Sequence, residues 1–565
     1  MSVRPNATPA GCPASSRGER RIASPAGPRF GRPATASASS LVQSAAIVGV
    51  AFVLSRILGM VREIIVAARF GTSGEYGAYL AAFRIPDLLF LVIMAGSFGS
   101  AFIPVFAGQL ARGQDERAWQ LASAVINLAA AAILISAAIV FVLADPIVRY
   151  LVAPGLSPEL QNLAAQTMRI LLLSPVLLGL GIAAKGILEA QDRFLLPALA
   201  PLLYNLGIIV GALLLAPFWG VYGLAAGVVI GALGHVGIQV PGLLRSGMRY
   251  TRSLTVRVEG LAEVGRLLLP RVIGQAAFQV NFIVVTYFAS QVGDDQIAAL
   301  NYAWQLMMLP HGVLALSIST VIFPSMARLF EEGRISELQV TFARALRPLL
   351  FLTLPAAVAL FAFRTAVVQT LFQYGAFSAR STALVADPLA FLALGLVFYA
   401  LVEVLTRAFY AMHDTRTPVI AGLVIIGINV TLSWVLVEPL GHAGLALSLA
   451  LTTGIEACIL IVALSRRLGG IGAGFGYWLA RVLAATAVMA ATAAIIARPL
   501  TEATAPGAGP RIVQIALFIL GFAITAIAFT ITAAVAELEE VDQLAARGTG
   551  IARRLVRAAG RRARR

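Results

Sequence analysis

The chain has 565 residues, of which 59% are hydrophobic and 12% charged, and its formal net charge is +16. Because a soluble domain has about 25% charged residues, this composition excludes an ordinary soluble protein and indicates a membrane protein with many spans. The positive charge is almost all arginine, since Lys185 is the sole lysine. It lies in tails and short loops, where it indicates membrane topology and contact with anionic phospholipid, not nucleic-acid binding.

The two ends of the chain are polar and basic. Residues 1–40 are rich in Arg, Pro, Ser, Ala and Gly, so we expect a disordered cytoplasmic tail and not a signal peptide. Residues 538–565 end in "ARGTGIARRLVRAAGRRARR", for which we expect a second cytoplasmic tail that touches lipid. Cys12 and Cys458 support neither a disulfide framework nor a zinc site.

Between the tails, apolar stretches alternate with polar residues, proline and glycine. A helix needs about 20 residues to cross about 30 Å of hydrocarbon. The breaks predict fourteen transmembrane helices, at 41–70, 77–108, 118–148, 160–189, 194–217, 220–244, 262–291, 296–329, 338–372, 383–411, 416–437, 441–466, 475–498 and 511–536. An even number puts both termini on one side, and the arginines that follow every second helix predict that this side is the cytoplasm.

The chain also resembles itself at an offset of about 220 residues. In order, "AFIPVFAGQLARG" aligns with "VIFPSMARLFEEG", "LVAPGLS" with "LFQYGAFS", "EAQDRFLLP" with "YAMHDTRTP", and "GVYGLAAG" with "GHAGLALS". These matches predict an all-α protein with two six-helix lobes related by duplication, residues 41–250 and 251–470, followed by two extra helices in 471–537. Parallel repeats are a transporter design with a substrate site between them. The alternative is a duplicated bundle without transport.

Charged side chains interrupt the first two predicted spans. The first contains Arg56, Arg62 and Glu63, and the second contains Arg84 and Asp87. Such charges are costly in hydrocarbon and mark functional sites. On an ideal helix Arg56 and Glu63 share a face, and Arg62 points about 120° away. Because the arginine fork binds phosphate oxygens in bidentate fashion, we predict a central cavity for an anionic, phosphate-bearing substrate. The alternative is mutual neutralisation within the bundle.

The second lobe has its own intramembrane charges, Glu403 and Arg407 in "LVEVLTRAFYAMHDTRTP". Together with Asp87 of the first lobe, we interpret them as candidate gating or coupling residues. For Glu403 and Arg407 the alternative is an ion pair at a helix end near the cytoplasm. The four histidines lack metal-ligand spacing, and there is no phosphate-binding loop. We therefore expect no metal, no cofactor and no enzyme activity, with the membrane potential or a cation gradient as candidate driving forces.

Several segments resemble the MurJ (MviN) family of lipid II flippases, which belongs to the multidrug/oligosaccharidyl-lipid/polysaccharide exporter superfamily. They include "SRILGMVREIIVAARFG", "AAFRIPDLL", "GSFGSAFIPVFA", "APLLYN", "LPHGVLALSISTVIFPSMA", "FQYGAF" and "FYAMHDTRTP". The resemblance covers residues 41–470. It implies two lobes around a central cavity and two extra helices that form a lipid groove. It also implies transport of undecaprenyl-diphosphate-linked peptidoglycan precursor (lipid II) to the outer leaflet of the bacterial cytoplasmic membrane, with cell-wall synthesis proteins as candidate partners.

The resemblance extends to site residues, but incompletely. It implies that Arg56 and Arg62 are essential and that Arg84 is a basic position of the cavity. Four positions differ from residues common in the family, where Asp, Arg, Glu and Arg are replaced by Gly77, Phe90, Ala95 and Gln305. Either Arg271 in "LLLPRVIGQ" substitutes, or the substrate or coupling differs. A flippase for another polyprenyl-diphosphate-linked glycan and a non-transporting cell-wall scaffold remain the alternatives.

Overall fold

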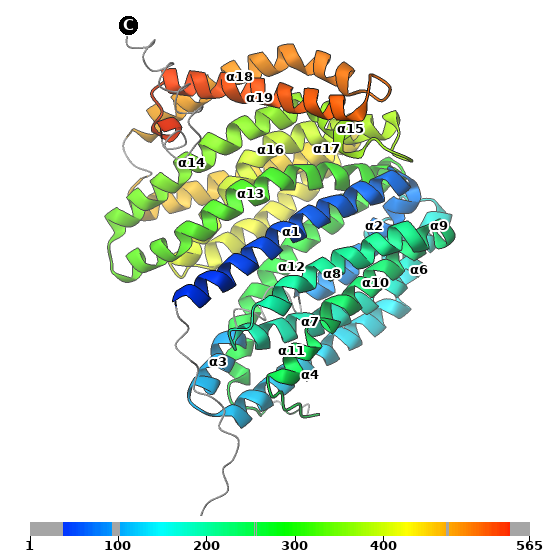
Figure 1. The fold of residues 1–565 in the computed structure, drawn as a ribbon, viewed down its shortest axis with the longest axis vertical. Helices are drawn as coiled ribbons and strands as arrows, with labels where there is room; N and C mark the ends of the chain where they lie inside the picture. Colours follow the sequence, from blue (N-terminus) through cyan, green and yellow to red (C-terminus); the bar gives the residue numbers. More distant parts are fainter. Residues whose placement is uncertain (1–37, 93–101, 253–254, 256, 471–473, 543–565) are drawn as a thin grey trace, which may run out of the picture. The chain divides into compact units, whose positions relative to one another are not determined.

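The computed structural model describes residues 38–92, 102–252, 255, 257–470 and 474–542 (Figure 1). Side chains within 38–47, 267–275 and 277–278 lie outside that description. All regular elements in the described ranges are helices, which confirms the all-α class. Ten helical segments of this part are long and apolar enough to cross a membrane. The number fourteen itself stays a prediction.

The first lobe begins with two helices that carry the intramembrane charges. Its helices are α1 (Ala38–Phe70), α2 (Gly74–Phe90), α3 (Ile103–Ala111), α4 (Asp115–Val142), α5 (Ala144–Pro146), η3 (Ile147–Val152), α6 (Pro158–Leu171), α7 (Leu173–Glu189), α8 (Leu195–Val210), η4 (Gly211–Leu215), α9 (Ala216–Trp219), α10 (Val221–Gly237) and α11 (Val240–Arg245). Leu172 and the π-helical turn η4 interrupt longer runs, so several of these labels are parts of one span.

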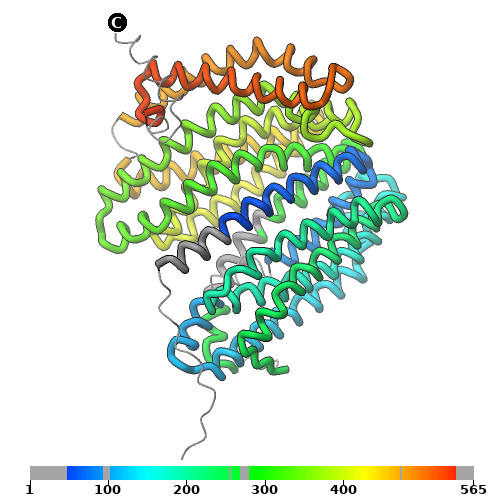
Figure 2. The backbone as a smooth tube through the Cα atoms, viewed as in Figure 1, coloured from blue at the N-terminus to red at the C-terminus, as the bar shows by residue number. Residues whose placement is uncertain are grey.

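The second lobe and the extra pair use fewer, longer helices. They are α12 (Leu261–Val292), α13 (Gln296–Glu331), α14 (Ile335–Ala362), α15 (Arg364–Phe372), α16 (Ala379–Ala411), α17 (Arg416–Leu468), α18 (Phe475–Thr504) and α19 (Arg511–Val535). Gly441 divides α17 into two spans, because its φ of 57° and ψ of −139° are not helical. α18 packs on both α14 and α19, so the extra pair lies against the second lobe, as the tube in Figure 2 also shows.

Equivalent positions of the two lobes share unusual backbone conformations. Gly220 has φ 55° and ψ −135°, nearly the values of Gly441. Asp192 and His413 have φ of 59° and 60°, a left-handed conformation that few residues other than glycine adopt. Both pairs fall in segments that the repeat aligns, so the duplicated sequence also repeats its turns.

Small residues let helices of the first lobe approach closely. A Cβ atom on Gly211 would lie 2.6 Å from the Cα of Gly227, where α10 meets η4. Membrane helices gain van der Waals contact in this way, because lipid offers no hydrophobic driving force between them. The two lobes meet through α2, which packs against both α12 and α13. This junction places charged residues of α1 and α2 beside the second lobe.

Candidate functional site

A cavity of about 210 Å³ lies where α1 and α2 of the first lobe meet α8 of the same lobe and α13 of the second. α1 contributes Arg62 and Glu63, and α2 contributes Arg84 and Asp87. The other lining residues are Val66, Tyr76, Tyr79, Leu80, Phe83, Tyr204, Ile208, Leu224, Asn301 and Gln305. Asn301 and Gln305 come from α13, so the second lobe supplies part of the wall. Four of the predicted site residues therefore share one cavity.

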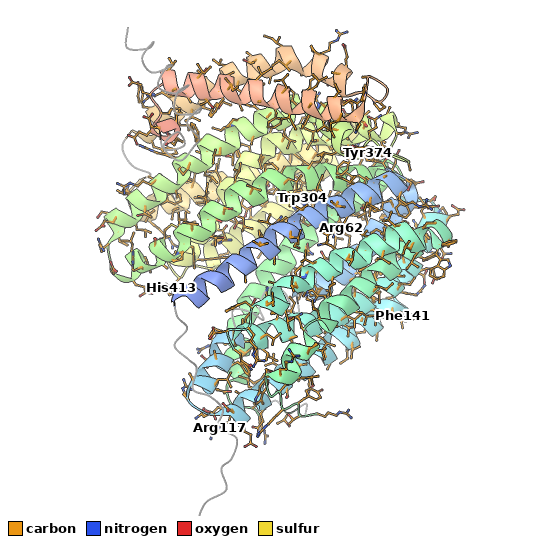
Figure 3. The ribbon with its side chains drawn as sticks, in the orientation of Figure 1. Arg62, Arg117, Phe141, Trp304, Tyr374 and His413 are labelled. Carbon is orange, nitrogen blue, oxygen red and sulfur yellow. The ribbon has the colours of Figure 1, made fainter. Side chains whose placement is uncertain are left out.

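Arg62 of α1 (Figure 3) is hydrogen-bonded to its neighbour Glu63 and to a residue of α8. Its Nε donates to Glu63 Oε1 at 3.1 Å, and its Nη1 donates to Asn205 Oδ1 of α8 at 3.0 Å. Glu63 is 6% exposed, and its Oε2 has no hydrogen-bond partner among the described residues. A buried carboxylate therefore lies beside the cavity, and its Oε2 can still accept a hydrogen bond.

Arg84 and Asp87 each bind a side chain of α12 and not one another. Arg84 Nε donates to Thr286 Oγ1 at 2.8 Å, and its guanidinium carbon lies 5.3 Å from the ring centroid of Phe282. Gln279 Nε2 donates to Asp87 Oδ2 at 2.8 Å. These contacts join the lobes through α2 and α12. The bond to Thr286 uses one of the five N–H donors of Arg84.

Arg56 lies apart from this cavity and does not line it. Its guanidinium carbon is 5.3 Å from the ring centroid of Phe52. On the other side it faces α13, where a Cβ atom on Gly312 would lie 3.2 Å from Arg56 Nη1. α1 therefore presents Arg62 to α8 of the first lobe and Arg56 to α13 of the second.

Glu403 and Arg407 form an ion pair one turn apart on α16. Arg407 Nε donates to Glu403 Oε1 at 2.9 Å, and its Nη1 donates to Thr320 Oγ1 of α13 at 2.9 Å. Ser319 Oγ donates to Glu403 Oε1 at 3.3 Å. Both residues are outside the cavity lining. They bridge two helices of the second lobe, and their predicted gating or coupling role stays a prediction.

The positions that depart from the family have different surroundings. Gly77 is buried in α2, where a Cβ atom would lie 2.7 Å from the carbonyl oxygen of Asp294, so a larger residue cannot fit here. Gln305 lines the cavity, and Phe90 packs against an apolar cluster. Ala95 lies outside the described residues, and so does the side chain of Arg271, although its backbone belongs to α12.

At one end of the lobes, loops of the first repeat contact loops of the second. Thr72 Oγ1 and Ser381 Oγ are 2.9 Å apart, and both side chains are buried. Within the second lobe, Arg380 Nη2 donates to Asp295 Oδ2 at 2.9 Å. The backbone N–H of Ser157 donates to Asp294 Oδ1 at 3.3 Å. We call this set of contacts, together with the glycines described next, the loop gate.

Two equivalent glycines complete the loop gate. Gly155 and Gly375 align in the internal repeat. A Cβ atom on Gly375 would overlap the carbonyl oxygen of Ala68, and one on Gly155 would overlap that of Ser290. Each glycine therefore brings its loop against the end of the other lobe's first helix. This crossed arrangement closes one end of the interface between the lobes by backbone contact.

Sequence reasoning missed the uncharged part of this site. Tyr76 stacks on Tyr79 and on Tyr302, with ring centroids 5.8 and 5.4 Å apart, and Asn205 binds Arg62. These residues look like ordinary core or helix-packing residues in the sequence. The one sequence signal for the loop gate is the alignment of Gly155 with Gly375 in the internal repeat.

Known proteins similar to this chain have the same architecture. A family model described as lipid II flippase MurJ matches residues 66–513. A Burkholderia cenocepacia protein named lipid II flippase MurJ is 32% identical over 73% of this chain and 82% of its own length. A Rhizobium tropici protein named probable lipid II flippase MurJ is also 32% identical, over 76% of this chain and 81% of its own.

Solved structures show the same fold. A lipid II flippase MurJ in an inward closed conformation has a TM-score of 0.69 at 24% identity, covering 85% of this chain and 98% of its own. An inward-facing multidrug resistance transporter of the MATE family, in the MOP superfamily, has a TM-score of 0.62 at 18% identity, covering 74% and 94%. At these identities the likeness concerns the fold alone.

Proposed function

Because the chain belongs to the lipid II flippase MurJ family, we propose that it moves lipid II from the cytoplasmic to the outer leaflet by alternating access. It is a multi-pass protein of the inner membrane. The observation that carries the proposal is the buried Arg62–Glu63 pair beside Arg84 in a cavity between two lobes. Arginine forks suit a diphosphate, and a cavity at a repeat interface suits transport.

The loop gate supports alternating access. Its loops follow the first, third, seventh and ninth predicted spans, which lie opposite the arginine-rich loops. By the positive-inside rule, both termini are then cytoplasmic and the gate is at the outer side. A closed outer end fits a state that receives substrate from the cytoplasm. Rocking of the two lobes would break the crossed contacts and expose the cavity outward.

We infer that the diphosphate of the substrate binds Arg62, Arg84 and Arg56, with Glu63 near the first of them. Arg56 faces the second lobe, so it would contact a substrate that spans the interface. Arg271 remains a proposed addition to this set. Asp87, Glu403 and Arg407 are proposed to transmit the lobe movement, because each bonds across helices. Anionic phospholipid and cell-wall synthesis proteins are further proposed partners.

Complementation tests the proposed function. Cells depleted of their own lipid II flippase should grow when this chain is expressed, and labelled lipid II should become accessible at the outer leaflet. A flippase for another polyprenyl-diphosphate glycan would leave lipid II inside but flip its own lipid in vesicles. A scaffold would flip neither. Abundance measured by blot separates loss of transport from loss of protein.

A further inference from the structure

The last helix of each lobe's six-helix unit carries one ionisable residue at an equivalent position. When Gly220 is aligned with Gly441, His235 falls opposite Glu456, because each is the fifteenth residue after its glycine. At 1.5 Å per residue, both lie about 22 Å along their helices. This is well inside a hydrocarbon layer about 30 Å thick, where an ionisable side chain is a functional candidate.

Glu456 lies on the inner face of α17 without a partner. It shares a helical stripe with buried Leu449, Thr453 and Leu460, and it is itself partly buried. Within the described ranges, its carboxyl group makes no hydrogen bond or ion pair. An unpaired carboxylate is costly in such a place. A proton on the carboxyl group removes that cost.

Glu456 differs in this respect from the other buried or partly buried carboxylates of the lobes. Glu63 is paired with Arg62, Asp87 accepts from Gln279, and Glu403 is paired with Arg407. Each of these has a donor that stabilises its charged form. Glu456 has no such donor among the described residues.

His235 has similar surroundings in the first lobe. It is 7% exposed, and its Nδ1 is buried without a hydrogen-bond partner among the described residues. Gly181 of α7 makes room for it, since a Cβ atom there would overlap the imidazole ring. Lys185 is a nearby charge. Both lobes thus hold one unpaired ionisable group at this depth.

A continuous row of side chains connects Glu456 to the cavity. The side chain of Tyr399 lies near both Glu456 and Thr453. Its ring packs edge-on against Trp304, with centroids 5.2 Å apart, and Trp304 packs likewise against Phe282 at 5.0 Å. Phe282 faces Arg84 of the cavity. A change in charge at Glu456 can therefore affect Tyr399, Trp304 and Phe282, which lie between it and the cavity.

Among the described side chains of the helices packed against α17, the charged groups pair elsewhere, pack on an aromatic ring or are exposed. On α16, Glu403 pairs with Arg407. On α13, His311 lies near Glu403, Arg56 and the backbone of Tyr399. On α14, Arg344 is exposed and Arg347 lies over Trp478, and on α12 Tyr287 packs on Phe288, while Glu263 and Arg266 are exposed. None of these provides a counter-charge for Glu456.

We propose that Glu456 is a proton-binding site that couples a proton gradient to the movement of the lobes, with His235 at the equivalent position of the first lobe. When the site is dry, the proton stays on the carboxyl oxygen. When the lobes rearrange and water enters, the O–H bond breaks, and the proton passes to water and leaves a carboxylate. The coupling role rests on the proposed flippase function, whereas proton binding does not.

The test uses full-length protein in proteoliposomes that contain lipid II, with an imposed pH gradient. Wild type should flip faster with the gradient than without it. Glu456→Gln, which mimics the proton-bound form, should lose this response. Glu438→Gln serves as the matched control, since Glu438 is an exposed acid on the same helix, and it should respond like wild type. A gradient response that survives in Glu456→Gln would overturn the coupling role.

Infrared titration provides a readout independent of transport. The protonated-carboxyl band at neutral pH should be present in wild type and Glu438→Gln and reduced in Glu456→Gln. An unchanged band in Glu456→Gln overturns proton binding at this residue. If no variant flips lipid II but the band is still reduced in Glu456→Gln, the flippase function fails while the proton site stands.

Discussion

The backbone N–H of Ala376 donates a hydrogen bond to the carbonyl oxygen of Ala68 at 2.8 Å. This bond joins a loop of the second lobe to the end of α1 in the first. It is part of the loop gate, which also includes Thr72 and Ser381. Because these contacts lie between lobes, a rocking movement must break them, and covalent links across them should arrest transport.

A cysteine pair at Thr72 and Ser381 should therefore lock the protein. The side-chain oxygens are 2.9 Å apart, so an oxidant should form a disulfide between cysteines placed there, in a background with Cys12 and Cys458 replaced by serine. Flipping should stop on oxidation and return on reduction. Each single-cysteine variant is the control. Unchanged flipping by fully crosslinked protein would contradict opening of this gate during transport.

Gly155→Ala should weaken the closed gate. The added methyl would overlap the carbonyl oxygen of Ser290, and neither backbone can yield as a flexible side chain can. Spontaneous crosslinking of the Thr72–Ser381 cysteine pair should fall several-fold, and flipping should fall with it. Gly108→Ala is the matched control, because nothing lies within 4 Å of a Cβ atom there. Equal crosslinking in both variants would show that close approach at Gly155 is not required.

Arg62→Ala and Arg56→Ala should fail in different ways. Loss of Arg62 leaves Glu63 charged and buried, a defect that costs roughly 3–5 kcal/mol when a buried pair is broken, so abundance should fall. Arg62→Ala with Glu63→Gln should restore abundance but not flipping. Arg56 lies over the ring of Phe52 and makes no ion pair with a carboxylate among the described residues, so Arg56→Ala should abolish flipping at normal abundance.

Arg56→Lys completes this comparison. A lysine keeps the charge but lacks the bidentate fork, so flipping should be partial. Lipid II at the outer leaflet measures flipping, and blots measure abundance. Normal flipping by Arg56→Ala at wild-type abundance would remove Arg56 from the proposed diphosphate site.

Stability should depend on pH through Asp414, in the loop before α17. Burial raises the pKa of Asp414, but hydrogen bonds from Thr417 and Arg416 and the charge of Arg467 outweigh this effect, so its pKa lies below the usual 3.8. Arg467 Nη2 is 2.6 Å from Asp414 Oδ2. A depressed pKa in the folded state contributes stability that is present above the unfolded pKa and lost as pH falls through the folded value.

The thermal midpoint of wild type should therefore drop as the pH falls below about 4. In Asp414→Asn the midpoint should be lower at pH 7 and should lose this part of the acid dependence. Glu438→Gln, which changes an exposed acid, should titrate like wild type. Parallel midpoint curves for wild type and Asp414→Asn would rule out the contribution.

The sequence alone determined the class of the protein and its internal symmetry. Apolar stretches can avoid exposing backbone groups to lipid only by forming helices, so composition and spacing were sufficient to predict an all-α membrane protein. The aligned segments predicted the duplication, and residues such as Gly220 and Gly441 then adopt the same backbone conformation. Charges inside apolar spans also predicted a cavity, and Arg62, Glu63, Arg84 and Asp87 line one, whereas Arg56 does not.

Only the tertiary structure decided which groups these charges meet. Helical periodicity gives the direction of a side chain, but not the helix that faces it. Arg62 meets Asn205, which is 143 residues away, and Arg56 faces Gly312 on the other lobe. The same holds for Gly77, which must be small because the backbone of Asp294 passes beside it. Such contacts depend on how distant helices pack, and a local sequence pattern carries no record of that packing.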